Sequence, residues 1–112
     1  MVKTKVEIKK RINKFVNKLQ KYVTVNKVIL YGSWVNGSPD ELSDIDLAIF
    51  SPDFGKNKLK ELQLLSKIAW EVDESIEAIP YSAEQLKNNN PTNFVYKIKE
   101  TGETVYDRAI KH

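Results

Sequence analysis

Apolar residues near the start of the chain recur at alternating steps of four and three. This spacing places them on one face of a helix, and the lysines fall mostly off that face. We therefore predict a helix over residues 4–21. The apolar positions are Ile8, Ile12, Phe15, Leu19 and Tyr22. The same periodicity predicts a second amphipathic helix over residues 56–72. Its apolar positions are Leu59, Leu62, Leu65, Ile68, Ala69 and Val72.

Three short runs are typical of strands. Residues 27–31 are apolar and β-branched and stop at Gly32, so they predict a buried strand. Residues 44–50 alternate in polarity, which predicts a strand with two different faces. Residues 75–79 predict a third strand, which we expect to end at Pro80 because proline cannot donate to a strand ladder. A turn cluster at residues 36–40 separates the first two strands, and its Gly37 is expected to take a positive φ.

The last third of the chain contains signals for short elements. Ser82 and Gln85 have the capping-box spacing, which predicts a short helix. Pro91 begins a further helical segment, which Gly102 is expected to cap before a small edge strand at residues 104–106. The apolar side of that helix is formed by Phe94, Val95 and Ile98. The order of elements predicts an α+β (α/β-like) fold, a small mixed sheet with helices covering one face.

Composition narrows the possible functions. The chain has 112 residues and 41% hydrophobic residues, as expected for a single domain of residues 1–112. There is no cysteine, and the single histidine is His112, which argues against thiolate zinc sites and histidine bases. No apolar run approaches the roughly 20 residues of a membrane helix. We therefore expect a soluble, cytoplasmic protein with no membrane partner.

Charge is divided unevenly along the chain. Residues 1–27 hold nine Lys or Arg and one acid, whereas residues 28–112 hold nine bases and 14 acids, or net charges of +8 and −5. Between residues 28 and 55 there are five acids and no base. The basic segment is interpreted first as a solvated face over a core-facing stripe, and second as a docking surface for an acidic partner or RNA. Nucleic acid is thus a possible partner but not the favoured one.

The acidic centre contains a pattern suited to metal and phosphate. Asp44 and Asp46 lie two apart on a predicted strand, so their carboxylates leave the same face and repel each other. Without nearby Lys or Arg, a divalent cation such as Mg²⁺ is the natural partner. Glu77 is the best candidate for a third carboxylate, because its neighbours on the third strand are apolar. Gly32 and Ser33 end the first strand, where a helical turn would offer free N–H groups to phosphate.

These residues resemble a known signature. Gly32-Ser33, ten further residues and then Asp44-Ile45-Asp46 are similar to the Gly-Ser-x10-Asp-x-Asp pattern of the DNA polymerase β-like nucleotidyltransferase superfamily. The form of the motif resembles the minimal nucleotidyltransferase (MNT) subgroup, which are single small domains typically encoded beside a HEPN-domain partner. The resemblance implies a nucleotidyltransferase fold similar to the polymerase β palm.

The resemblance also implies an activity and a set of site residues. It implies Mg²⁺-dependent transfer of AMP from ATP to a hydroxyl, expected to be a tyrosine of a HEPN toxin neutralised by this protein as antitoxin. Gly32 and Ser33 would bind the triphosphate, and Ser43, which is also expected to hydrogen-bond the turn, is added as a candidate nucleotide-binding residue. Asp44, Asp46 and Glu77 would form the catalytic triad and hold Mg²⁺, expected as two ions.

Alternatives follow from the departures from this pattern. Relatives often carry a basic residue after Gly-Ser, where this chain has Trp34, Val35 and Asn36. One alternative is therefore an inactive binding module that neutralises a toxin by complex formation. Another is a nucleic-acid-binding accessory domain that works through residues 1–27. Trp34 is expected to pack against the sheet edge, with stacking on a base as the second interpretation.

Overall fold

The structure is a computed structural model that describes residues 4–37, 39 and 43–110. Ser38 and Asp40 of the predicted turn lie outside the described residues. The elements in chain order are α1 (Lys5–Leu19), β1 (Lys27–Tyr31), α2 (Ser33–Asn36), β2 (Ile45–Ser51), α3 (Lys58–Val72), β3 (Ile76–Ser82), the 3-10 helix η1 (Ala83–Lys87), α4 (Phe94–Thr101) and β4 (Glu103–Asp107). The predicted α+β architecture is confirmed.

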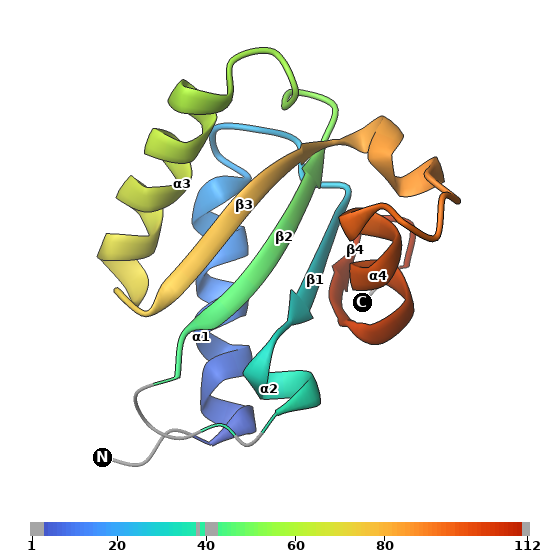
Figure 1. The fold of residues 1–112 in the computed structure, drawn as a ribbon. Coiled ribbons are helices and arrows are strands. Elements are labelled where there is room, and N and C mark those ends of the chain that lie inside the picture. Colours follow the sequence, from blue (N-terminus) through green and yellow to red (C-terminus); the bar gives the residue numbers. More distant parts are fainter. Residues whose placement is uncertain (1–3, 38, 40–42, 111–112) are drawn as a thin grey trace.

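The strands form one mixed sheet in the order β3-β2-β1-β4 (Figure 1). β1 pairs antiparallel with both β2 and β4, whereas β2 and β3 are parallel. A parallel pair needs a crossover connection, and α3 supplies it between β2 and β3. The two strands that carry the predicted acidic residues are therefore neighbours with the same direction.

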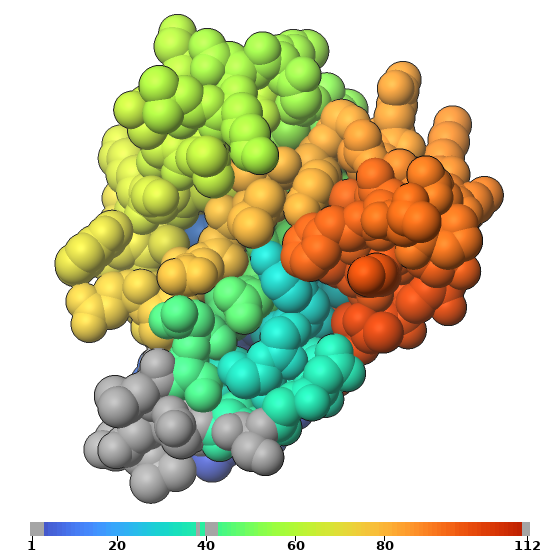
Figure 2. All heavy atoms as spheres, viewed as in Figure 1, coloured from blue at the N-terminus to red at the C-terminus, as the bar shows by residue number. Residues whose placement is uncertain are grey.

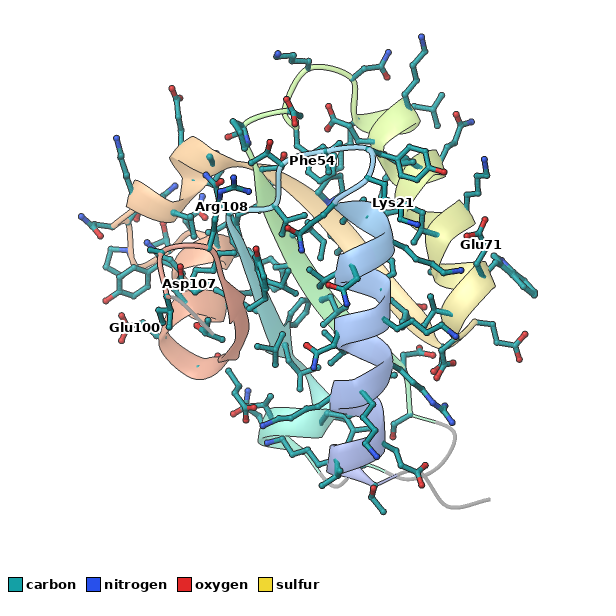
Figure 3. The ribbon with its side chains drawn as sticks, turned by 180° about the vertical axis from the view of Figure 1, so that it is seen from behind. Lys21, Phe54, Glu71, Glu100, Asp107 and Arg108 are labelled. Atoms are coloured by element: carbon teal, nitrogen blue, oxygen red, sulfur yellow. The ribbon has the colours of Figure 1, made fainter. Side chains whose placement is uncertain are left out.

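The main hydrophobic core lies between the sheet and the helices α1 and α3, as the predicted one-face cover requires. In Figure 1 α1 lies behind the sheet, and in Figure 3 it lies in front. The fully buried side chains of α1 include Ile8, Ile12, Phe15 and Leu19. They pack in one cluster with Ile45, Leu47 and Ile49 of β2 and with Leu65 and Ile68 of α3. The alternation predicted for residues 44–50 is confirmed.

A smaller cluster covers part of the opposite face of the sheet. There Ile29, Ala48 and Phe50 pack against Val95 and Ile98 of α4. The end of α4 lies against β1 at Gly102, because a Cβ at that position would come within 2.5 Å of the Ile29 Cγ2 and 2.9 Å of a β1 carbonyl oxygen. The part of this face near the start of β2 is left without a helix over it (Figure 1).

The basic N-terminal helix forms ion pairs with acids distant in sequence. Lys5 and Lys9 contact Glu103 of β4 at 2.6 and 2.9 Å, and Lys18 lies 3.5 Å from Glu71 of α3. This favours the solvated, charge-paired face among the interpretations of residues 1–27. Among the described residues, no helix is both long and apolar enough to cross a membrane.

Some predicted positions were wrong because the tertiary structure decides them. Tyr22 and Leu59, expected on apolar helix faces, are 60% and 67% exposed, since each lies at or beyond a helix end. β3 does not end at Pro80 but continues to Ser82. Proline is tolerated there because β3 is an edge strand, with no neighbouring strand on its outer side among the described residues. The predicted capping box is also absent, since Ser82 precedes η1 without a side-chain cap hydrogen bond.

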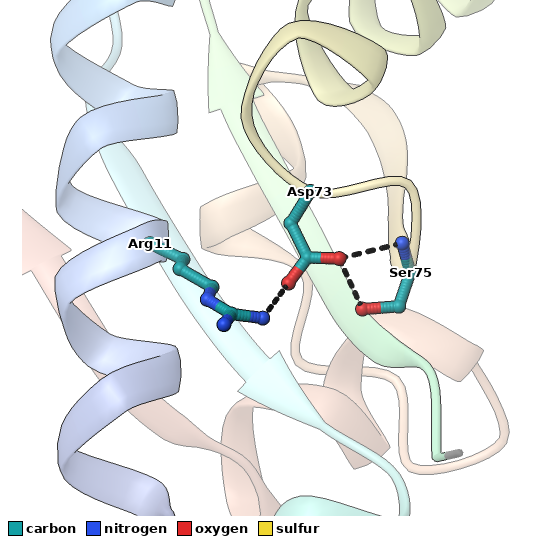
Figure 4. Close-up of polar contacts among 3 residues, drawn as sticks. All are labelled: Arg11, Asp73 and Ser75. Carbon is teal, nitrogen blue, oxygen red and sulfur yellow. Dashed lines mark hydrogen bonds and ion pairs between the residues drawn. The ribbon is translucent and has the colours of Figure 1, made fainter. Parts of the chain in front are cut away.

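A polar contact fixes the turn between α3 and β3 (Figure 4). The Asp73 carboxylate accepts from Arg11 of α1 at 2.5 Å and from the Ser75 N–H and hydroxyl at 2.9 and 2.7 Å. The Ser75 carbonyl in turn accepts from the Ile45 N–H at 2.8 Å. Asp73 thus links α1 to the first residues of both β2 and β3.

Replacing Asp73 by Ala should lower the free energy of unfolding by at least about 2 kcal/mol, because a single hydrogen bond to a charged group is worth about 1.5–3 kcal/mol and Asp73 accepts at least three. The Asp73 side chain is only 8% exposed, so water cannot replace its contacts. Urea denaturation of Asp73→Ala beside Glu74→Ala measures this, since Glu74 is exposed and should change stability by under about 0.5 kcal/mol. Equal losses in the two variants would contradict the role of Asp73.

Candidate functional site

The acidic residues predicted from the sequence come together on the sheet face that α1 and α3 leave uncovered. Asp46 of β2 is directly paired with Glu77 of β3, and on its other side with Tyr31 of β1. Asp44 lies one residue before β2 and is exposed. Parallel partners project from the same face at a strand spacing of about 4.8 Å. The predicted position of Glu77, facing away from the core residues Ile76 and Ala78, is confirmed.

The electrostatics of Asp46 reflect this crowding. Burial raises the pKa of Asp46 above its usual 3.8, and the carboxylates of Glu77 and Asp44 raise the pKa further. Tyr31 responds to the same surroundings, because burial and the charge of Asp46 raise the pKa of its hydroxyl to about 12. These shifts mean that the site disfavours additional negative charge until a cation balances it.

Gly32 and Ser33 lie directly beside these carboxylates. Gly32 has a φ of +79° and caps the short helix α2, which begins at Ser33 as predicted. A Cβ on Gly32 would overlap the Asp46 Oδ2, and the φ of +79° is one that other residues rarely adopt. Any larger residue would therefore strain the backbone and displace this carboxylate. The positive φ therefore belongs to Gly32. The prediction for Gly37 was wrong, because its φ is −122°.

The first turn of α2 is the candidate site for phosphate binding. The N–H groups at the start of a helix have no partner within it, and they attract anions. In α2 the Gly32 carbonyl accepts from Val35 and Asn36, so the earlier N–H groups at Ser33 and Trp34 are the ones at the open end. Ser43 is half-buried and immediately precedes Asp44. The predicted nucleotide-binding residues thus lie at the same end of the sheet as the carboxylates.

Trp34 packs into the main core, as expected from the sequence. Its side chain belongs to the cluster beneath the sheet and is only 8% exposed. Its indole N–H is buried and has no hydrogen-bond partner among the described residues. The second interpretation of Trp34, stacking on a base, is not compatible with this burial.

The carboxylates of Asp44, Asp46 and Glu77 have the chemistry that a divalent cation requires. Carboxylate oxygens are the ligands that Mg²⁺ prefers, and the three acids here lie close enough for Glu77 and Asp44 to raise the pKa of Asp46. In the conformation of the described residues, no three acidic side chains converge tightly enough to hold an ion. The assignment of Asp44, Asp46 and Glu77 as metal ligands stays a prediction.

A separate cavity of about 430 Å³ lies at the other end of β1. It is lined by Asn26, Lys27, Leu86, Lys99, Asp107, Arg108 and Ala109. Lys99 donates two hydrogen bonds of 2.7 Å to backbone carbonyl oxygens, and Lys27 lies 3.9 Å from Asp107. None of the acidic candidates lines this cavity, so we place the candidate site at the carboxylate end of the sheet instead.

Sequence reasoning missed two contributions to the site. The contact between Arg11 and Asp73 holds the starts of β2 and β3. These two residues are 62 positions apart, and no sequence pattern predicts a contact over that separation. Tyr31 was predicted only as the last residue of a buried strand, although its place immediately before Gly32 was a usable signal. Phe94 was expected to pack, yet it is 54% exposed and touches Tyr31.

Comparisons with solved structures show the fold. A toxin–antitoxin complex with AMP-PNP matches with a TM-score of 0.62 at 22% identity, covering 85% of this chain and 72% of that one. The toxin–antitoxin pair MntA-HepT matches with a TM-score of 0.58 at 19% identity, covering 88% and 72%. A mutant of that pair gives 0.60 at 18% identity, covering 88% and 73%.

Comparison with family models identifies the family. The model described as "Polymerase beta, Nucleotidyltransferase" matches residues 13–111, which include every candidate site residue. No curated protein sequence matches the chain. On the strength of this match and of the mixed sheet that carries the carboxylates, the chain belongs to the polymerase β nucleotidyltransferase family.

Proposed function

We propose that residues 1–112 form a single minimal nucleotidyltransferase domain that transfers AMP from ATP to a hydroxyl of a partner protein. The observation that carries the proposal is the pairing of Asp46 with Glu77 beside the Gly32–Ser33 loop. This arrangement combines a negative site for cations with an anion-binding helix start. The two together suit a metal-assisted displacement at phosphorus.

Each candidate residue has a chemical role in this proposal. Gly32 and Ser33 bind the phosphates, and Ser43 lies at the same end of the sheet. Asp44, Asp46 and Glu77 hold Mg²⁺, expected as two ions, which when bound would neutralise charge on the attacking and leaving oxygens. Glu77 is exposed and can reach an incoming acceptor, so it is also the candidate base.

The transfer of AMP needs only ATP and the acceptor hydroxyl as reactants. The acceptor oxygen forms a bond to the α-phosphorus of ATP while the bond to the β-phosphate oxygen breaks and pyrophosphate leaves. The proton of the acceptor hydroxyl passes to the Glu77 carboxylate and from there to water. The carboxylates of Glu77 and Asp44 crowd Asp46, and this negative charge disfavours ATP alone and favours ATP accompanied by cations.

We propose a tyrosine of a HEPN-domain toxin as the acceptor, with this protein as the antitoxin. The support is the likeness to two complexes, one described as the toxin–antitoxin MntA-HepT and the other as a toxin–antitoxin with the ATP analogue AMP-PNP. The description of the mutant complex names two aspartates two positions apart replaced by glutamate. Asp44 and Asp46 have the same spacing.

The second candidate function is binding without chemistry. It is favoured by the lack of a basic residue after Ser33. In the described conformation, no group of three acidic side chains lies close enough together to hold an ion. In that case the protein would neutralise its toxin by complex formation alone.

The transfer reaction is tested with Mg²⁺, α-labelled ATP and the protein encoded next to this one. The wild type should label that protein, and Asp44→Asn with Asp46→Asn should reduce the initial rate at least about a hundredfold, as loss of charge stabilisation typically does. Glu84→Gln is the matched control, since Glu84 is an exposed acid on η1. If neither the wild type nor the double Asn variant labels the partner, and the double Asn variant still neutralises toxicity, the binding module is favoured.

The acidic cluster also predicts a stability effect. Asp46→Asn should raise the melting temperature of the cation-free protein at pH 7 by a few degrees, because the variant removes a charge that burial, Glu77 and Asp44 disfavour. The folded pKa is raised, so the folded wild type binds the proton first as pH falls. The gain should therefore shrink toward about pH 4.

Thermal unfolding in EDTA measures the effect of the repulsion, and thermal unfolding in Mg²⁺ measures the stabilisation by the bound ion. Mg²⁺ should raise the melting temperature of the wild type but not of Asp46→Asn, because the ion binds only the intact folded site. Glu84→Gln should respond like the wild type. A loss of stability in Asp46→Asn at pH 7 would contradict the repulsion argued for this cluster.

A further inference from the structure

Phe94 is an exposed aromatic residue at the edge of the candidate site. It is the first residue of α4 and is 54% exposed, although the next residue, Val95, is buried in the smaller core cluster. Its ring meets the Tyr31 ring edge-to-face, with 5.9 Å between centroids and an interplanar angle of 85°. Tyr31 therefore fixes the orientation of a ring that otherwise faces solvent.

The position of Phe94 distinguishes it from other exposed apolar residues of the described chain. Those side chains are Val6, Tyr22, Leu59, Trp70 and Ile110. They belong to α1 and α3, to the segment after α1 or to the end of the chain. Phe94 instead contacts Tyr31, which is paired with Asp46 and is followed by Gly32. Among the exposed large apolar residues of the described chain, Phe94 is thus the one that lies beside the candidate site.

In the part of the chain that the structure describes, no helix covers the sheet face beside α4 (Figures 1 and 2). In Figure 2, which looks onto the uncovered sheet face, the atoms of β1 lie between α4 on one side and β2 and β3 on the other. Tyr81 is engaged in stacking on Phe50, with centroids 5.4 Å apart, and Trp34 is buried below the sheet. Among the described residues, Phe94 is thus the exposed ring that contacts Tyr31 beside the carboxylates.

We propose that Phe94, held by Tyr31, is the stacking platform for the nucleobase of the bound nucleotide. The inference rests on the proposed function, because phosphates at Gly32 and Ser33 and cations at Asp46 would anchor one end of the nucleotide next to Tyr31. The base at the other end then lies within reach of the exposed ring. Stacking is tolerant of base identity, so this platform predicts affinity for nucleobases with a modest preference for purines.

The test compares two ligands that share the phosphates and differ in the base. Isothermal titration with Mg²⁺ and either AMP-PNP or inorganic tripolyphosphate gives both affinities for the wild type, Phe94→Ala and Phe94→Tyr. Phe94→Ala should weaken AMP-PNP about tenfold, as expected for one lost stacking contact, and leave tripolyphosphate unchanged. Phe94→Tyr should retain the affinity for AMP-PNP. Trp70→Ala, which removes a 71% exposed ring on α3, should change neither.

The outcomes separate this inference from the proposed function. If the wild type binds neither ligand, both are overturned. If the wild type binds both and Phe94→Ala weakens neither, or weakens both equally, the platform is wrong while the phosphate site stands. If Phe94→Ala leaves AMP-PNP affinity intact and raises only the KM for the acceptor protein, the ring belongs to acceptor binding and the nucleobase assignment is overturned. Circular dichroism melting confirms that each variant is folded.

Discussion

The parallel pairing of β2 with β3 brings two carboxylates side by side on an uncovered face of the sheet. Asp46 and Glu77 are register partners, and burial together with this pairing raises the pKa of Asp46. The folded protein therefore carries a cost that unfolding would relieve. The rest of the structure keeps the pair in place, because α3 makes the crossover and the contact between Arg11 and Asp73 fixes the strand starts. A bound cation would supply positive charge and relieve the repulsion between the two carboxylates, which explains why the fold holds them together.

The local pattern was enough to predict the strands and the acidic face. Alternation in residues 44–50 placed Asp44 and Asp46 opposite Ile45 and Leu47, since the period of a strand leaves no other arrangement. Glu77 was predicted as the third carboxylate from its apolar neighbours, whereas its register pairing with Asp46 is known only from the structure. Contacts between distant segments could not be predicted in this way. The exposure of Phe94 depends on where α4 crosses β1, and Arg11 and Asp73 meet only because α1 and α3 pack side by side.

Backbone geometry explains why the loop after β1 tolerates little change. Gly32 has a positive φ and lies so close to Asp46 that any side chain would overlap the carboxylate. The loop that would bind phosphate and the residue that would bind a cation are therefore one structural unit. The basic charge near the N-terminus is used differently, since Lys5, Lys9 and Lys18 form ion pairs with β4 and α3 on the side away from this unit.

The central claim is that the carboxylate face holds a divalent cation together with the phosphates of a nucleotide. The most direct measurement is a crystal structure of the protein with Mn²⁺ and AMP-PNP, using the anomalous scattering of manganese to locate the ion. The account predicts an anomalous peak coordinated by Asp44 and Asp46, with the triphosphate at Gly32 and Ser33. A nucleotide bound elsewhere, or an ion that does not touch these aspartates, would contradict it.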